Sequence, residues 1–194
     1  MSPTPHATIL RWLRHAALTG LATAGVACLG FLLLNWWFPF PVSVLRRQPA
    51  VVVTDHSGAP LRVFLPPDEQ WRLPVTMSEV APVLRQTLIA SEDRWFYWHP
   101  GINPFSILRA AWANVRGRRI ISGASTIPMQ IARLAEPKPR TLWAKCREAF
   151  RALQLEWLFT KEELLEVYLN LTPYGGNLEG VGAAAHAYFG KTPA

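Results

Sequence analysis

The hydrophobic pattern divides the chain into one unbroken apolar run and a longer stretch in which apolar residues recur at intervals. The run AALTGLATAGVACLGFLLL covers residues 16–34, and no Asp, Glu, Lys or Arg falls between Arg14 and Arg46. A helix needs about 20 apolar residues to cross a bilayer, and it satisfies its own backbone groups there. We therefore predict a transmembrane helix, with Trp36 and Trp37 at its far interface.

The charges that flank the run indicate its orientation. Arg11 and Arg14 precede it, which places the N-terminus in the cytoplasm and the bulk of the chain outside, although Arg46 and Arg47 on the other flank weaken the bias. A cleaved signal peptide remains open as an alternative, but the run is long and no A-x-A site ends it. A lipoprotein signal ending at Cys28 fits less well, because more apolar sequence follows the cysteine.

Beyond the run, the pattern changes first to short strands and then to helices. Residues 51–65, VVVTDHSGAPLRVFL, predict a hairpin of two strands that turns at His56-Ser57-Gly58. Apolar residues at helical spacing, separated by Pro and Gly, predict six helices after Ser78. The six predicted helices cover residues 79–97, 105–117, 126–134, 141–159, 160–171 and 179–188. Asn103 before Pro104, and Thr160 with Glu163 three residues later, are typical of helix starts. The predicted fold class is mainly α, with a small β hairpin near the membrane and one transmembrane helix before it.

These elements divide the chain into four predicted parts. They are a cytoplasmic tail (1–15), the transmembrane helix (16–38), a linker with the β-containing juxtamembrane region (39–77) and a helical domain (78–194). Because the chain ends soon after the last helical pattern, we expect the domain to be truncated at its C-terminus.

Charge and cysteine content narrow the picture only a little. Half of the 194 residues are hydrophobic and the net charge is +7. A basic balance implies an anionic partner, which composition alone leaves open between nucleic acid, a membrane surface and a phosphorylated substrate. Cys28 and Cys146 are the two cysteines, they lie in unrelated segments, and neither has the neighbours of a zinc site, so we expect no disulfide framework.

Two adjacent carboxylates, Glu92 and Asp93, are the first candidates for chemistry. Within the helix predicted there, adjacent side chains point about 100° apart, so only one of them faces a cleft while the other pairs with Arg94 or a nearby backbone group. Burial by the aromatic residues that follow would raise the pKa of the cleft-facing carboxyl, which suits a general base. A surface charge cluster is the alternative.

For the other polar residues, a structural role explains the sequence as well as a functional role does. His99 is more simply a structural residue than a catalyst. Ser125 and Thr126 either cap a helix or hold a phosphate at its N-terminus. Gln130 and Arg133 share one helical face with Thr126. The alternating charges of Lys145, Arg147 and Glu148 are also typical of a solvated helix face.

Taken together and in order, five segments resemble the motifs of glycosyltransferase family 51, the peptidoglycan glycosyltransferases. The segments are 92–101 (EDRWFYWHPG), 123–133 (GASTIPMQIAR), 145–148 (KCRE), 161–170 (KEELLEVYLN) and 179–191 (EGVGAAAHAYFGK). The resemblance implies a lysozyme-like helical fold with a small membrane-proximal jaw. It covers about half of the chain, all of it after residue 88.

The resemblance also implies roles for individual residues. Glu92 is expected to be the general base, and Glu148 a second catalytic group at the pyrophosphate end. The residues expected to support the base or bind substrate are Asp93, Phe96, His99, Ser125, Thr126, Gln130, Arg133, Lys145 and Arg147. Four positions depart from the family motifs, namely Asn103, Pro128, Met129 and Ala144. The last departure removes a phosphate-binding arginine.

The implied activity is polymerisation of lipid II into glycan strands, with inversion as the lipid pyrophosphate leaves. Lysine and arginine stabilise the leaving charge, and the resemblance leaves open whether a divalent metal, Mg²⁺ or Mn²⁺, takes part. Expected partners are lipid II, the growing strand, inner-membrane lipids and proteins of cell-wall synthesis or division, and not nucleic acid. The expected location is the inner membrane, crossed once, with the catalytic domain in the periplasm. Two alternatives remain: a lysozyme-like lytic enzyme, and a non-catalytic membrane protein that binds the lipid-linked precursor.

Overall fold

A computed structural model describes residues 5–57, 60–119 and 123–194, which form two units. The first unit ends at Phe40 and the second covers Pro41–Ala194. The predicted hairpin turn includes Gly58, which lies outside the described residues.

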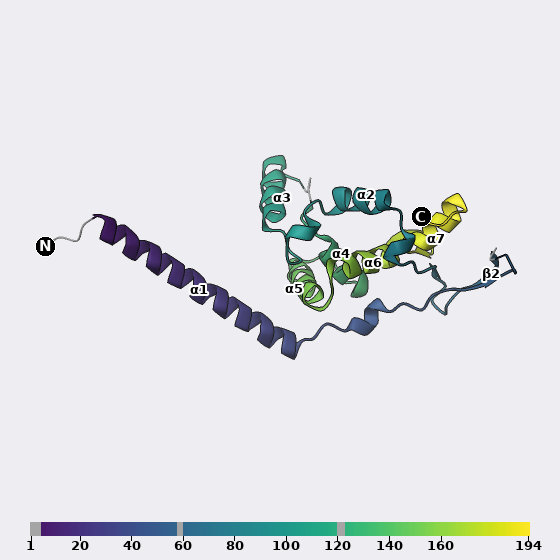
Figure 1. Ribbon diagram of the computed structural model, residues 1–194, viewed down its shortest axis with the longest axis horizontal. Helices are drawn as coiled ribbons and strands as arrows, with labels where there is room; N and C mark the ends of the chain where they lie inside the picture. The colour runs from purple at the N-terminus through teal and green to yellow at the C-terminus, as the bar shows by residue number, and fades with distance from the viewer. Residues whose placement is uncertain (1–4, 58–59, 120–122) are drawn as a thin grey trace. The chain divides into compact units, whose positions relative to one another are not determined.

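The first unit is dominated by one long helix, α1 (Pro5–Trp37) (Figure 1). Within the described chain, only its segment Trp12–Trp37 is long and apolar enough to cross a membrane. Those 26 residues span about 39 Å at the rise of an α-helix, against about 30 Å of hydrocarbon. The hydroxyls of Thr19 and Thr23 donate to the carbonyls of His15 and Thr19, so these polar side chains are satisfied within the helix.

The second unit is mainly helical, as the periodicity predicts. Its helices are α2 (Pro82–Glu92), α3 (Pro104–Gly117), α4 (Ile127–Ala135), α5 (Leu142–Leu158), α6 (Lys161–Leu171) and α7 (Val181–Phe189), with short 3-10 helices η1 (Val42–Leu45), η2 (Met77–Glu79) and η3 (Phe96–Trp98). Three of the predicted start signals are confirmed. The side chain of Asn103 accepts from the Ser106 amide, that of Thr126 from the Met129 amide, and Thr160 forms a capping box with Glu163.

The core forms where α4 packs against α5 and α6, and these three helices lie together in Figure 1. Helix α4 is buried over most of its surface, unlike an ordinary amphipathic surface helix. The aliphatic side chains that are fully buried there are Ile127, Ile131, Leu155, Leu164, Leu165 and Leu169. Because α4 is held on most sides by the core, those of its side chains that reach the surface have well-defined positions.

One predicted helix is too long. We expected a helix over residues 79–97, but α2 ends at Glu92 and the chain turns at Asp93, which has an extended φ of −155°. Glu92 and Asp93 therefore do not both belong to a regular helix. The different directions of their side chains do not result from the 100° step between adjacent helical residues. They result from a change of backbone direction between the two residues.

The strands form two small sheets. The predicted hairpin is present as β1 (Val51–Thr54) paired antiparallel with β2 (Pro60–Phe64). A second sheet was not predicted: β5 (Leu178–Glu179) lies between β3 (Trp71–Arg72), to which it is parallel, and β4 (Pro173–Gly175), to which it is antiparallel. The buried Arg72 side chain reinforces this sheet, with a nitrogen 2.9 Å from a carboxylate oxygen of Glu179.

Close packing in this part of the fold requires glycine. A Cβ atom at Gly182, in the first turn of α7, would lie 2.1 Å from the carbonyl oxygen of Leu73. Helix α7 therefore approaches the backbone that follows β3 more closely than any side chain would allow. Elsewhere in the chain, Cys28 and Cys146 are both free and exposed.

Candidate active site

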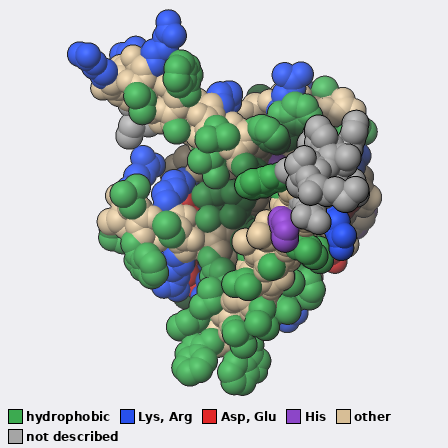
Figure 2. Space-filling view, turned by 90° about the vertical axis from the view of Figure 1, so that its left-hand side faces the viewer, with side chains coloured by type: hydrophobic (Ala, Val, Ile, Leu, Met, Phe, Trp, Pro, Cys, Tyr) green, Lys and Arg blue, Asp and Glu red, His purple; other side chains and the backbone are tan. Residues whose placement is uncertain are grey.

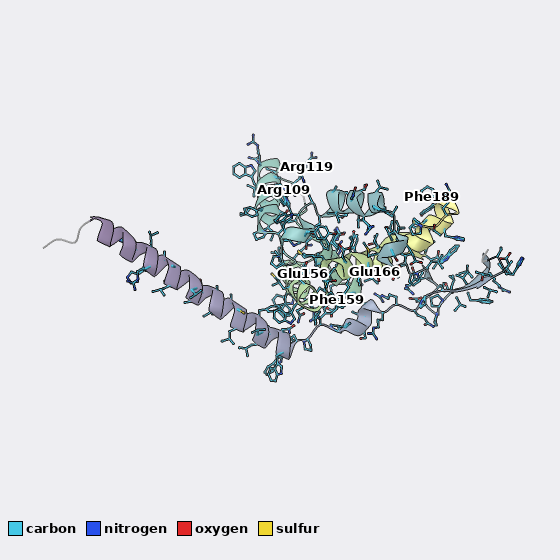
Figure 3. All side chains as sticks on the ribbon, in the orientation of Figure 1. Arg109, Arg119, Glu156, Phe159, Glu166 and Phe189 are labelled. Atoms are coloured by element: carbon cyan, nitrogen blue, oxygen red, sulfur yellow. The ribbon has the colours of Figure 1, made fainter. Side chains whose placement is uncertain are left out.

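Glu92 is the last residue of α2 and faces a polar pocket of about 360 Å³. The pocket is lined by α2 and the turn after it, by Ser106 and Arg109 of α3, and by residues 123–126 before α4. Figure 3 shows Arg109 on α3. The side chain of Glu92 is exposed, so the burial by aromatic residues that we expected is wrong. The carboxylate is instead accessible from solvent, as a base that meets an external substrate must be.

A hydrogen bond fixes the position of the Glu92 carboxylate. Its Oε2 accepts from Nε2 of Gln130 at 2.9 Å, and Gln130 is on the central helix α4. The Oε1 of Gln130 lies 3.2 Å from the hydroxyl of Tyr168 on α6. Burial, and after it the charge of Glu92, raise the pKa of Tyr168 and of Tyr174. Both tyrosines were missed as site residues, although Tyr168 falls within the fourth motif.

Asp93 has a different environment from its neighbour. It is 7% exposed, its two carboxylate oxygens each lie 3.0 Å from Nε2 of His99, and Oδ2 also accepts from the Ile127 amide at 3.0 Å. Because Nδ1 of His99 accepts from the Gly101 amide, the ring proton is on Nε2 and points at Asp93. The expected pairing with a backbone group is confirmed, and the group is the first amide of α4.

Thr126 and Phe96 complete a buried polar junction, by which we mean Asp93, His99, Gly101 and Thr126 with the ring of Phe96 beside them. The hydroxyl of Thr126 donates to the Gly101 carbonyl at 2.5 Å, and Phe96 is fully buried. Of the two alternatives for Thr126, the cap is confirmed. A negative charge does lie at the N-terminus of α4, but it is the Asp93 carboxylate of the protein itself.

A second group of polar residues links the loop before α4 to α5. Nζ of Lys145 lies 2.7 Å from the hydroxyl of Ser125 and 2.8 Å from Oε2 of Glu148. Ser125 also lines the Glu92 pocket, so the structure brings Lys145 and Glu148 to the edge of that pocket. The side chain of Lys145 is 48% exposed, so it remains accessible to an anionic ligand.

Arg147 belongs to a separate charged cluster with Glu136, Lys138 and Arg151. The carboxylate of Glu136 lies 2.9 Å from Arg147, 3.2 Å from Lys138 and 3.5 Å from Arg151. The structure therefore does not place Arg147 beside Lys145, although both belong to the third motif. Arg133 lies on α4 one turn from Gln130 and close enough to Tyr168 for its charge to oppose the rise in the tyrosine's pKa.

Comparison with known proteins identifies the family to which this site belongs. The family described as Transglycosylase matches residues 57–194, which is most of the chain and all of the pocket. The chain belongs to the transglycosylase family. Penicillin-binding protein 1C of Escherichia coli (strain K12) is 50% identical over 155 residues, and penicillin-binding protein 1A of the same organism is 46% identical over 125 residues. Penicillin-binding protein 4 of Bacillus subtilis (strain 168) is 38% identical over 125 residues.

These relatives are much longer than the matched region. The alignment with penicillin-binding protein 1C covers 80% of this chain and 20% of that protein, and the alignment with penicillin-binding protein 1A covers 64% and 15%. The resemblance stated from the five motifs is confirmed, including the similarity to penicillin-binding protein 1C indicated by the sequence around Met129 and Ile131. The mainly helical fold class with small sheets is confirmed as well.

The departures from the transglycosylase motifs have structural explanations in two cases. Pro128 falls in the first turn of α4, where a backbone amide has no partner within the helix, so proline costs no hydrogen bond there. Met129 is 6% exposed and contributes to the core. Ala144 is also buried, and it lies near the cluster around Glu136. On α5, the cation beside the edge of the pocket is the ammonium of Lys145, which contacts Ser125.

Proposed function

We propose that this chain is a peptidoglycan glycosyltransferase that polymerises lipid II, with Glu92 as the general base. The observation that carries the proposal is that the two carboxylates of the first motif have separate tasks. Asp93 is fully engaged inside the junction, whereas Glu92 is exposed on a polar pocket and held by a single amide.

The reaction needs one base and a way to stabilise a leaving anion. Glu92 takes the proton from the 4-hydroxyl of the acceptor sugar as that oxygen bonds to C1 of the donor. The C1–O bond to the lipid pyrophosphate breaks at the same time, its electron pair leaves with the phosphate, and the single displacement inverts C1. Lys145 is the cation best placed for the departing charge, with Arg133 and Arg147 further away and Glu148 holding the Lys145 ammonium. Ser125 and Thr126 line the donor side of the pocket, and Gln130 reaches it through its hydrogen bond to Glu92.

A protein-held metal is not part of this proposal. Across the residues that the structure describes, no three His, Cys, Asp or Glu side chains come together. The Asp93 oxygens already accept from His99 and from the Ile127 amide, so Asp93 is not available to share an ion with Glu92. The residues at the site therefore do not fit a metal centre of their own, and the steps above rely on lysine and arginine.

A lytic reaction is less well supported by the same geometry. Glycoside hydrolysis uses a protonated acid together with a second free carboxyl group. The neighbouring carboxylate Asp93 is buried and already bonded to His99 and to the Ile127 amide, so it is not a free second carboxyl group. Glycosyl transfer from a pyrophosphate needs no such acid.

We further propose that the chain is anchored once in the inner membrane, with the second unit in the periplasm. Helix α1 supports the anchor by its length and apolar composition. Helix α3 supports contact with membrane lipids, because Phe105, Leu108, Trp112 and Val115 recur on one face and are 68–83% exposed. Helix α3 also carries arginine between these apolar residues. Figure 2 shows Lys and Arg side chains at several places on the displayed face and few acidic side chains. Lipid head groups and the substrate pyrophosphate are the anionic partners that the net charge implies.

The test is a polymerisation assay with the full chain in detergent. Purified protein is incubated with lipid-linked disaccharide-peptide and the products are separated by size. We expect polymer from the wild type and a loss of at least about 100-fold in Glu92→Gln, because this change removes the base. The variant should retain its helical circular dichroism and its melting temperature, because Glu92 is exposed.

Other outcomes would contradict the proposal. Shortening of preformed glycan would indicate a lytic enzyme. Binding of the lipid without any product would indicate a non-catalytic protein. Undiminished polymer from Glu92→Gln would show that another group removes the proton.

A further inference from the structure

Three polar side chains from three different helices follow one another from the surface into the core. Glu92 ends α2, Gln130 lies on α4, and Tyr168 lies on α6. The carboxylate of Glu92 is 2.9 Å from the Gln130 amide nitrogen, and the Gln130 amide oxygen is 3.2 Å from the Tyr168 hydroxyl. The series begins at an exposed side chain and ends at one that is only 4% exposed.

The chemistry of the two end groups determines how the amide between them is oriented. An ionised carboxylate only accepts hydrogen bonds, so the NH₂ of Gln130 must face Glu92. The amide oxygen then faces Tyr168, which has to donate. Burial first, and then the charge of Glu92, raise the pKa of Tyr168, although the Thr172 hydroxyl and Arg133 oppose the shift, so the phenol keeps its proton at neutral pH. Each bond therefore has one possible direction.

Resting on the function proposed above, we propose that Tyr168 is a positioning residue for the general base, acting through Gln130. Without its hydroxyl, the Gln130 amide has no fixed rotation and can present its oxygen, which repels the carboxylate. With the hydroxyl, the amide presents its nitrogen and holds Glu92 towards the pocket. Glu92 needs this support, because it is the last residue of its helix and its side chain is exposed.

Helix α6 is well suited to act as the fixed end. Its first turn is closed by the capping box of Thr160 and Glu163, and Leu164, Leu165 and Leu169 are fully buried around Tyr168. A side chain held by such packing has little freedom to move. Two hydrogen bonds therefore connect the exposed carboxylate of Glu92 to a side chain that is fixed in the core. The rate of a catalysed reaction falls steeply when a catalytic group is misplaced.

The first experiment removes only the hydroxyl. Tyr168→Phe keeps the buried ring, and we expect kcat for polymerisation to fall about tenfold or more while KM changes by less than about twofold, since the substrate contacts stay in place. Tyr188→Phe is the matched control. Its hydroxyl also makes a hydrogen bond, to the carbonyl of Tyr174, but the residue is 60% exposed, and the Gln130 amide bonds to Glu92 and Tyr168 instead. Unchanged kcat in Tyr168→Phe would overturn the proposal.

A double-mutant cycle tests whether the effect passes through Gln130. In a Gln130→Met background there is no amide to orient, so adding Tyr168→Phe should not lower the residual rate further. If the two losses instead multiply, Tyr168 acts on its own and the positioning role is wrong.

A measurement that needs no turnover separates this inference from the proposed function. The chain has five glutamines, so selective ¹⁵N labelling gives few side-chain amide signals, and Gln130→Met identifies the relevant one. We expect that signal to shift in both Tyr168→Phe and Glu92→Gln, and not in Tyr188→Phe. An unchanged chemical shift of the Gln130 amide in Tyr168→Phe would refute the hydrogen-bonded series even if the enzyme is active. A shift in both variants would support the series even if no polymer is made.

Discussion

Two polar regions meet at the N-terminus of α4 and differ in their exposure and in how their polar groups are paired. The buried polar junction of Asp93, His99, Gly101 and Thr126 satisfies its donors and acceptors internally. The open region of Glu92, Ser125, Lys145 and Glu148 keeps charged groups in contact with solvent. The first region resists change because each lost partner leaves a buried group unpaired, whereas the second can exchange its partners for water or for a substrate.

Adjacent residues of the same chemical type therefore have opposite tasks. Asp93 fixes the start of α4 and the loop after α2, and Glu92 is left free to react. A carboxylate-to-amide change at each position compares the two regions with the smallest possible alteration.

Asp93→Asn should have the largest effect on stability. The amide oxygen can take the place of Oδ2, but the NH₂ group then stands at the position of Oδ1, 3.0 Å from Nε2 of His99, so that two donors face each other inside the protein and the charge of the carboxylate is lost. We expect the free energy of unfolding to fall by about 3 kcal/mol and the melting temperature by roughly 6–12 °C. Thermal unfolding followed by circular dichroism measures this. Glu92→Gln is the matched control and should change stability by less than about 0.5 kcal/mol. Equal losses in the two variants would erase the distinction between the regions.

Lys145→Met should show the reverse pattern, with a large effect on rate and little on stability. The Lys145 side chain is half exposed, so its ion pair with Glu148 stabilises the fold by about 1 kcal/mol at most. A missing cation at the leaving group should slow polymerisation by roughly 100-fold. Lys145→Arg should restore part of the rate. Lys138→Met removes another lysine paired with a glutamate and serves as a control that should remain active. Comparable rates for the two methionine variants would show that Lys145 does not face the leaving group.

The sequence predicts the local features of this molecule better than the long-range ones. Helix starts at Asn103, Thr126 and Thr160 follow from side chains that bond to amides three residues away, and such signals are local. The end of α2 at Glu92 could not be predicted, because no glycine or proline marks it. It is set by Asp93, whose partners His99 and the Ile127 amide are brought to it by the tertiary fold. The β3–β5 pairing escapes prediction because strands of two residues have no periodicity.

The candidate site divides in the same way. The motif resemblance supplied Glu92, Gln130, Lys145 and Glu148 as site residues, but it did not show which of them meet. Tyr168 reaches Gln130 only because of the register between α6 and α4, which depends on core packing. Arg147 was expected, like Lys145, to bind substrate, but it faces Glu136, because the two side chains leave α5 in different directions.

The smallest predicted effect concerns the charged cluster around Glu136. A substitution there tests how much the ion pairs of this cluster contribute to the free energy of unfolding. Burial by itself would raise the pKa of Glu136, but the hydrogen bond from Lys138 and the charges of Arg151 and Arg147 together lower it below the usual 4.5. The unfolded chain therefore binds this proton at a higher pH than the folded one, so the stabilisation is complete above pH 4.5 and disappears as the pH falls through the lowered pKa. Denaturant unfolding should show Glu136→Gln about 1 kcal/mol less stable than the wild type at pH 7 and equally stable near pH 3. A difference that stays constant across this range would mean that Glu136 stabilises the protein by packing, and that its ion pairs contribute nothing.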